Sequence, residues 1–343
     1  MPFSFGFGGD DVEDADQQQL SQVDHQEEQL QPEQSSQLRP QKFTFAQALE
    51  SLPSQVSYNT LDITGHVRVC RRALFDIRAQ LMAEADIANN NDHLLAGLDK
   101  GDLTSGVYEG GFKTWECAVD LAQYVASQQF EGSWHIIELG AGSAIPSCVL
   151  LRQAAAAAPS SQKRYQLTLC DYNEAVLKLC TAPNVLLNTN HLIISQEQDQ
   201  QANEQDLDLE TFDAARLVSD LESKAVNVGF IAGSWGPELA ELALSEQPSG
   251  SRPNLLVLAS ETIYAPGSLL VFVQTLQQFL NSGAPSVVIL VAAKQLYFGV
   301  GGGVEEFARV AAENGLAVEL VSQVPSAGVS RVILSIRRQN TSA

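Results

Sequence analysis

Residues 136–147 read "IIELGAGSAIPS", in which an apolar run reaches an acid, Glu138, and then a Gly-x-Gly turn. An apolar run that ends in such a turn is typical of a buried strand followed by a helix. Glycines at the turn let the backbone approach a ligand closely, because they have no Cβ. Ligands of open α/β sheets bind at the carboxyl ends of the strands, so we expect a nucleotide-like ligand over Gly140.

The turn departs from the dinucleotide-binding pattern, which has a third glycine where this chain has Ile145 and Pro146. A proline in the first turn of a helix offers no N–H to a phosphate, and Glu138 would repel one. S-adenosylmethionine (SAM) carries adenosine, a sulfonium and an amino acid but no phosphate, and therefore fits better than NAD. Asp171 ends the next apolar run, where a carboxylate can accept both ribose hydroxyl protons of either ligand.

From residue 106 onwards, apolar strand-like runs alternate with helical patterns, which predicts an α/β domain over 106–343. The series indicates a mostly parallel sheet with helices on both faces, closed by a C-terminal antiparallel hairpin. Residues 195–227 are polar and acidic, and we interpret them as an insertion between the second and third strands. The predicted strands are residues 134–139, 165–171, 227–233, 254–261, 286–294, 316–324 and 329–338.

Two segments precede this domain. Residues 1–41 form a predicted disordered acidic tail, because a Gln-, Asp- and Glu-rich segment buries too little apolar surface to offset its ordering entropy. Its start, "PFSFGF", is either a short docking strand or a chance run of aromatics. Residues 42–105 are a predicted N-terminal helical extension, in which Leu74, Ile77, Leu81 and Met82 have helical spacing. Removal of everything before Gln41 is expected to leave cofactor binding unchanged, because the tail is far in sequence from every cofactor motif.

Composition limits the partners and the location. The net charge of −21 disfavours direct nucleic-acid binding and suits a basic protein partner, although it also serves plain solubility. The five cysteines include no CxxC pair, which predicts reduced thiols in a cytoplasmic and nuclear protein. Neither a signal peptide nor a membrane-spanning run is expected, and the five scattered histidines argue against a metal site.

Further polar groups follow the other predicted strands. "ASETIY" places Ser260, Glu261 and Tyr264 after the fourth strand, and "AGSWG" places Ser234 and Trp235 after the third. A glycine-rich loop, residues 299–303, follows the fifth. Each of these groups also has a simpler structural interpretation, as a helix cap, a loop anchor or a linker. Because parallel strands end at one edge of a sheet, we expect the groups to lie together.

The motifs "GVYEGGFKTWECAVDL", "CDYNEAVLKLCTAPNV", "AGSWGPEL", "ASETIYAP" and "AAKQLYFGVGGG" resemble, together with the glycine turn, the eukaryotic histidine protein methyltransferases of fungal type. The resemblance covers nearly the whole chain and implies a Rossmann-like, seven-stranded methyltransferase fold that uses SAM. It also implies methyl transfer to a histidine of a large-subunit ribosomal protein, ribosomal protein three. Ala141 stands where many members have Cys, a small change that leaves the cofactor assignment in place. With Glu138 added from the turn, the implied cofactor contacts are Thr114, Trp115, Glu116, Cys117, Ala118, Glu138, Gly140, Asp171, Tyr172, Asn173, Gly233, Ser234, Trp235 and Ser260.

Catalysis of this reaction needs positioning more than base strength, because a neutral imidazole is already nucleophilic. A carboxylate that accepts the second ring N–H would fix the tautomer, and Glu261 is the first candidate, with Glu116 the second. Tyr264 would shape the substrate slot. The rival interpretations are a lysine methyltransferase of the same fold, a nicotinamide oxidoreductase and a non-catalytic SAM-binding ribosome-assembly factor. We expect a monomer.

Overall fold

The computed structural model describes residues 38–88, 110–156, 163–189, 205–245, 252–299, 301–325 and 329–339. They belong to one compact unit, Ser36–Ala343. Residues 1–37, which make up most of the predicted tail, lie outside the described part of the chain.

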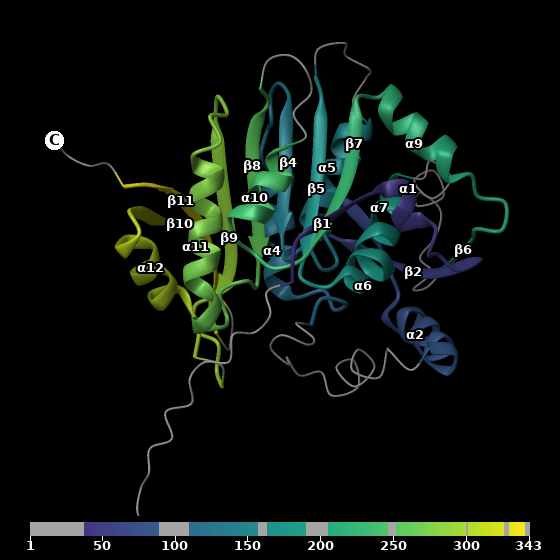
Figure 1. The fold of residues 1–343 in the computed structure, drawn as a ribbon, viewed down its shortest axis with the longest axis horizontal. Coiled ribbons are helices and arrows are strands. Elements are labelled where there is room, and N and C mark those ends of the chain that lie inside the picture. The colour runs from purple at the N-terminus through teal and green to yellow at the C-terminus, as the bar shows by residue number, and fades with distance from the viewer. Residues whose placement is uncertain are drawn as a thin grey trace, which may run out of the picture. The chain divides into compact units, whose positions relative to one another are not determined.

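An eight-stranded sheet forms the centre of the fold, in the order β1-β7-β5-β4-β8-β9-β11-β10 (Figure 1). Five neighbouring strands run parallel, from β7 to β9, and β11 and β10 continue the sheet as an antiparallel hairpin. Seven of its strands, all but β1, form the mostly parallel sheet with a C-terminal hairpin that the sequence predicts. Its strands in chain order are β1 (Gln41–Thr44), β4 (Trp134–Leu139), β5 (Tyr165–Asp171), β7 (Val226–Ala232), β8 (Asn254–Ser260), β9 (Val287–Lys294), β10 (Leu316–Val324) and β11 (Arg331–Arg338).

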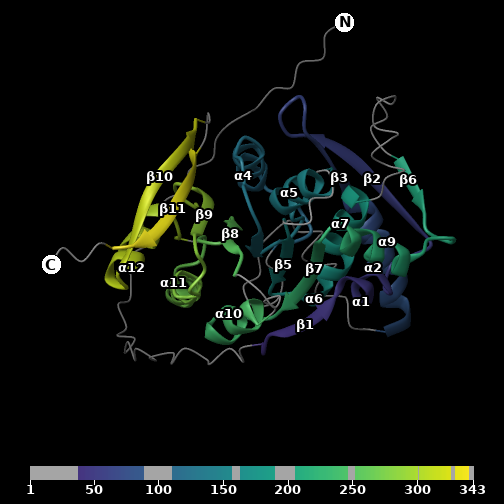
Figure 2. The same cartoon turned by 90° about the horizontal axis from the view of Figure 1, so that it is seen from above.

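The sheet is buried on both faces, and successive residues of a central strand enter different cores. In β4, Ile136 belongs to the core under one face and Ile137 to the core under the other. Figure 2 shows α4 and α5 on one side of the sheet and α10 and α11 on the other. The first core is covered by α1 (Phe45–Leu49), α4 (Glu116–Ala126), α5 (Ile145–Ala156), α7 (Ala182–Thr189) and α9 (Ala214–Ser223), and the second by α10 (Pro237–Leu244), α11 (Pro266–Leu280) and α12 (Val304–Glu313).

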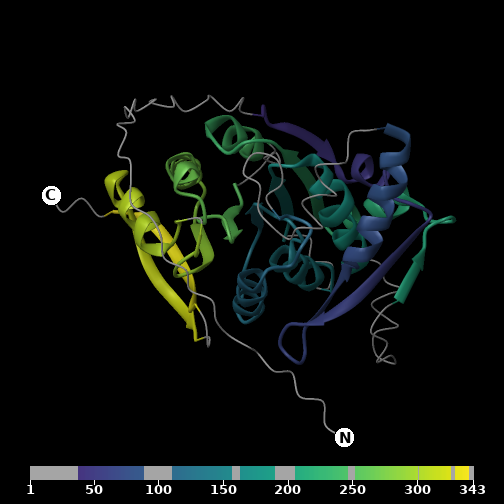
Figure 3. The same ribbon diagram turned by 90° about the horizontal axis from the view of Figure 1, so that it is seen from below.

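The N-terminal extension contains strands as well as helices, which corrects the expectation of a helical segment. β1 adds an antiparallel strand to the edge of the main sheet beside β7. Strands β2 (Gln55–Asp62) and β3 (Arg68–Arg72) form a second, three-stranded sheet with β6 (Gln205–Asp208), which comes from the predicted insertion (Figure 3).

The four residues of the extension with helical spacing all lie in one helix, α2 (Leu74–Ala88). Ile77 and Leu81 are buried there, whereas Leu74 and Met82 are exposed. The residues before α2 form a strand and a turn. Val69 pairs along β2, and Val67 lies in the β2–β3 turn, because the folded chain offers these β-branched residues a strand partner.

A short π-helical turn connects β5 to α7. After α6 (Glu174–Val176), the turn η1 covers Leu177–Thr181. Pro183, which follows, has no N–H for the carbonyl of Leu179, and the Arg72 guanidinium donates to that carbonyl instead at 2.9 Å. The extension is therefore hydrogen-bonded to the segment that follows Asp171.

Candidate cofactor and methyl-acceptor site

The glycine turn after β4 has a left-handed backbone, with φ of +62° at Gly140 and +50° at Gly142. A Cβ on Gly140 would lie 3.0 Å from Cγ2 of Thr262, and one on Gly142 would lie 3.0 Å from the carbonyl oxygen of Gly111. The turn is therefore enclosed by the segment after β8 and the segment before α4. Glycine is required at both positions for conformation and for space.

Glu138 is fully buried behind the turn. Its Oε2 accepts the backbone N–H of Ser147 at 3.1 Å, and burial raises the pKa of this carboxyl to about 7. Pro146 has no N–H, so the first turn of α5 has one donor missing and the next one engaged by Glu138. The pyrophosphate site that NAD would need is thus weakened, and a ligand without phosphate fits this turn better.

Asp171 holds the turn in place from the end of β5. Its Oδ2 accepts the N–H of Gly142 at 3.0 Å, and its Oδ1 accepts the N–H of Asn173 at 3.1 Å. Asp171 therefore supports the glycine turn in addition to its predicted role toward the ribose.

The turn after β7 carries Gly233, Ser234 and Trp235. The N–H of Gly233 donates to the carbonyl oxygen of Asp171 at 2.9 Å, which joins this turn to the end of β5. The Trp235 ring packs on Phe272 with 4.8 Å between ring centroids. It also lies 4.0 Å from the position that a Cβ on Gly140 would take. The structure thus brings three of the predicted cofactor segments together.

Glu261 stands directly after β8 with a left-handed backbone, φ +56°, which is strained for a residue other than glycine. Its N–H donates to the carbonyl oxygen of Ala292 at 2.9 Å. Its Oε1 is buried and makes no hydrogen bond to any described residue. A buried carboxylate oxygen without a donor indicates a place for an incoming N–H or O–H group.

The surroundings of Glu261 come from two other elements. Burial raises the pKa of the Cys117 thiol in α4, and the neighbouring Glu261 carboxylate raises it further. Burial and the same carboxylate raise the pKa of the Tyr297 hydroxyl, which also accepts the backbone N–H of Lys294 at 3.2 Å. Both groups stay protonated beside the carboxylate.

Glu116, the second catalytic candidate, lies at a more exposed position. Its Oε2 is 3.1 Å from Nζ of Lys294, and 60% of its side chain is accessible. The hydrogen bond to Lys294 lowers the pKa of Glu116. Lys294 and Lys113 also lie over the Trp115 ring, 5.6 Å and 5.2 Å from its centroid. An ion-paired, exposed carboxylate is a weaker candidate for orienting a substrate than Glu261.

Tyr264 packs edge-on against Tyr297, with 6.4 Å between ring centroids. The glycine-rich loop is built against it, because a Cβ on Gly302 would lie 2.1 Å from the carbonyl oxygen of Tyr264. The N–H of Tyr297 donates to the carbonyl oxygen of Gly302 at 3.0 Å. The loop is therefore a packed part of the site rather than a linker. Sequence reasoning missed Tyr297 and Lys294, and their position after the fifth strand was the available signal.

The residues at this edge fit a SAM molecule. Three buried polar atoms that follow the carboxyl ends of β5 and β8 have no described partner: Oγ1 of Thr262, Nδ2 of Asn173 and Oε1 of Glu261. Thr262 was not predicted, whereas Ser260 ends β8 beside Ala292 as expected. Thr114 and Tyr172 are half-buried next to Trp115 and Asp171, and Ala118 is buried in α4. These predicted contacts stay predictions.

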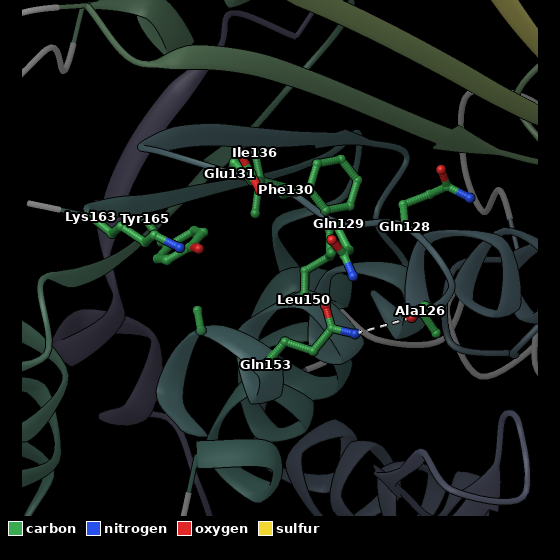
Figure 4. Close-up of a pocket in the computed structure, with 11 residues that line it drawn as sticks. Ala126, Gln128, Gln129, Phe130, Glu131, Ile136, Leu150, Gln153, Lys163 and Tyr165 are labelled. Carbon is green, nitrogen blue, oxygen red and sulfur yellow. Dashed lines mark hydrogen bonds between the residues drawn. The ribbon is translucent and has the colours of Figure 1, made fainter. Parts of the chain in front are cut away.

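A cavity of about 460 Å³ lies elsewhere, at the amino-terminal edge of the sheet (Figure 4). Its lining includes Tyr165 at the start of β5, Glu131 before β4 and Gln153 near the end of α5. Parallel strands place that edge opposite the glycine turn, so the cavity is separate from the site. Within the described ranges, no cluster of metal-ligating side chains occurs and no helix has the length and apolarity to cross a bilayer.

Comparison with known proteins identifies relatives of this chain. No protein-family model matches it. It is 37% identical over 254 residues to Histidine protein methyltransferase 1 of Saccharomyces cerevisiae, which covers 69% of this chain and 67% of the relative. It is 35% identical over 263 residues to the protein of the same name from Schizosaccharomyces pombe, covering 76% and 73%.

Solved structures show weaker likeness. A ribosomal protein L11 methylase from Lactobacillus delbrueckii subsp. bulgaricus matches at 9% identity and a TM-score of 0.36, over 82% of this chain and all of that one. Mitomycin 7-O-methyltransferase MmcR matches at 15% identity and a TM-score of 0.33, over 76% and 60%. The yeast relatives are decisive: this chain belongs to the histidine protein methyltransferase family.

Proposed function

We propose that this protein is a SAM-dependent protein-histidine N-methyltransferase whose substrate is a basic large-subunit ribosomal protein, ribosomal protein three. The observation that carries the chemistry is Glu261, whose buried Oε1 lacks a donor at the edge where the glycine turn lies. The relatives' names support histidine as the acceptor. The ribosomal substrate rests on the motif resemblance and on the net charge of −21, which favours a basic partner.

SAM, when bound, supplies a methyl group on a sulfonium centre. Gly140 and Gly142 give the backbone room to approach it, and Asp171 holds that turn through the N–H of Gly142. The Trp235 ring lies near Gly140 and borders the same turn. These residues bind and orient, which is the main requirement of an in-line transfer.

Glu261 acts on the methyl acceptor. Its Oε1 accepts the N–H of the substrate imidazole, so the other ring nitrogen is unprotonated and keeps its lone pair for the new bond. As the ring becomes positive, the carboxylate stabilises it, and the ring proton is held between the nitrogen and Oε1. Cys117 and Tyr297 beside the carboxylate stay protonated and add no charge to the site.

The test compares ribosomal proteins from cells with and without this protein by mass spectrometry, together with methylation in vitro by the wild type and by Glu261→Gln. The proposal expects one methylated histidine that disappears with the protein and returns with the wild type only. A methylated lysine would contradict the acceptor. Restoration of ribosome assembly by a chain that cannot bind SAM would favour a non-catalytic role, and NAD binding by calorimetry would favour the oxidoreductase. A monomeric state and a cytoplasmic and nuclear location stay predictions.

A further inference from the structure

Residues 38–40, immediately before β1, lie against one of the cofactor segments. The carbonyl oxygen of Leu38 accepts the backbone N–H of Ser234 at 2.9 Å. A Cβ on Gly233 would lie 2.7 Å from Cα and 2.9 Å from N of Pro40, and 3.1 Å from the oxygen of Leu38. The chain thus passes over the turn after β7 at a distance that only glycine allows.

Hydrogen bonds connect residues 38–40 to the glycine turn through the turn after β7 and through Asp171. Gln41 is in register with Ala232, so β1 carries this segment to the carboxyl edge of β7. The N–H of Gly233 donates to the carbonyl oxygen of Asp171 at 2.9 Å, and the Asp171 carboxylate accepts the N–H of Gly142 at 3.0 Å. One connected series of residues therefore runs along the sheet edge, from Leu38 through Ser234 and Gly233 to Asp171 and then Gly142.

The ion pair in this region contributes little. Nε of Arg39 is 2.8 Å from Oε1 of Glu238, but 83% and 55% of the two side chains are accessible to solvent. Exposed pairs of this kind are screened and pay for ordering two long side chains. The backbone contacts of Leu38 and Pro40 therefore hold the turn.

We infer that residues 38–40 are a positioning segment of the cofactor site, which fixes the turn of Gly233, Ser234 and Trp235 for SAM. The inference rests on the proposed function. It revises the expectation that removal of everything before Gln41 leaves cofactor binding unchanged, because two of the removed residues, Leu38 and Pro40, contact the predicted cofactor residues Ser234 and Gly233.

A matched pair of glycine variants tests the contact in the full chain. Gly233 and Gly236 have nearly the same backbone, φ +140° and +145°, but nothing lies within 4 Å of a Cβ on Gly236. Gly233→Ala should weaken SAM binding by calorimetry at least about tenfold more than Gly236→Ala. Its KM for SAM should rise while kcat at saturating SAM stays within about threefold, which a loss of stability would not produce.

Truncation completes the test. A chain that starts at Ser36 should bind SAM like the full chain, whereas one that starts at Gln41 should bind at least about tenfold more weakly. In the latter chain, the difference between Gly233→Ala and Gly236→Ala should vanish, because Leu38 and Pro40 are absent. Equal SAM affinity of the two truncated chains, or an equal effect of the two glycine variants in the full chain, would overturn the inference. Absence of SAM binding by the full chain would instead refute the proposed function.

Discussion

At the scale of single residues, strain and unsatisfied polar atoms mark the site. Glu261 combines a left-handed backbone with a buried carboxylate oxygen that has no described partner. Neither feature benefits the folded state, since a left-handed non-glycine residue costs of order 1–3 kcal/mol and an unsatisfied buried acceptor a similar amount. Their coincidence at the end of β8 supports the proposed role of Glu261 toward the methyl acceptor.

Glu261→Gln should lower kcat by about a hundredfold, because an amide cannot stabilise the developing imidazolium as a carboxylate does. SAM affinity should stay near that of the wild type, because the change is isosteric and the cofactor turn is untouched. Single-turnover methylation and calorimetry measure the two quantities. A variant with normal kcat would assign Glu261 to loop structure alone.

Gly302→Ala should reduce methylation while the protein stays folded. The new Cβ would lie 2.1 Å from the carbonyl oxygen of Tyr264, so the loop must move and carry Tyr264 and Tyr297 with it. Gly267→Ala is the matched control, since nothing lies within 4 Å of its Cβ. Steady-state kinetics of the two variants should differ by about tenfold or more in kcat/KM; equal values would mean that the loop does not shape the site.

Glu138 should make stability depend on pH. Its pKa is about 7 in the folded chain against about 4.3 in model peptides, so between these values the folded state binds the proton more tightly. The unfolding free energy contributed by this group therefore falls as pH rises from about 4.3 through 7, by about 4 kcal/mol in full. Glu138→Gln removes the charge and keeps an oxygen for the N–H of Ser147.

The measurement is the melting temperature of both proteins from pH 5 to 8. The advantage of Glu138→Gln over the wild type should grow with pH across that range. The buried His135, whose pKa is lowered to about 4, is common to both proteins and cancels in the difference. An advantage that is constant with pH would show that Glu138 has no shifted titration.

At the scale of elements, α7 joins the extension to the cofactor turn through buried asparagines. Asn184 accepts the N–H of Arg72 at 2.7 Å and donates to the carbonyl oxygen of Ser143 at 2.8 Å. Asn188 accepts the N–H of Cys70 at 2.9 Å and donates to its carbonyl oxygen at 2.7 Å. The edge of β3 is thus paired by side chains of a helix, which satisfies backbone groups that would otherwise be buried unpaired.

Asn188→Ala should lower the free energy of unfolding by about 2–5 kcal/mol, because two buried backbone groups of Cys70 lose their partner. Asn281→Ala, at an exposed hydrogen bond to Arg338, should cost less than about 1 kcal/mol. Urea denaturation measures both. A loss below about 1 kcal/mol for Asn188→Ala would mean that water replaces the side chain and that α7 does not anchor β3.

At the scale of the whole molecule, the net charge of −21 acts on encounter with a partner rather than on the fold. For a full-length basic ribosomal protein, kcat/KM should fall about fivefold or more from low salt to about 0.3 M, because screening shortens the reach of exposed charges. A short neutral peptide that contains the same histidine should show no such dependence. Methylation of the full protein at a rate independent of salt would exclude electrostatic guidance.

The contribution of the tail to guidance is measured with a chain that starts at Ser36, which keeps Leu38 and Pro40. Its methylation of the full basic protein should be slower than that of the full chain at low salt and equal at high salt. Its SAM affinity is the control and should not change. Equal rates at low salt would show that the tail is not an electrostatic guide.

The sequence by itself determined the central α/β domain and the edge at which the cofactor site lies. Apolar runs of strand length, each followed by turn residues, located β4, β5, β8 and β9 to within a residue or two. A strand that is buried on both faces is a continuous apolar run, and this can be seen in each strand by itself. The glycines and acids that follow those runs could be identified in the same way, because each of them lies next to its own strand in the sequence. The resemblance implied a seven-stranded methyltransferase fold, but only the structure gives the order of the strands in the sheet.

Only the tertiary structure decided the pairings between remote segments. Residues far apart in sequence meet in four places. Strand β1 pairs with β7, β2 pairs with β6, Leu38 and Pro40 lie over Gly233, and Tyr297 lies beside Glu261. The sequence of a short strand such as β1 does not show which strand it pairs with, because the pairing depends on the register and the free edge of another segment. An unsatisfied atom such as Oε1 of Glu261 is likewise defined only by what the folded chain places around it.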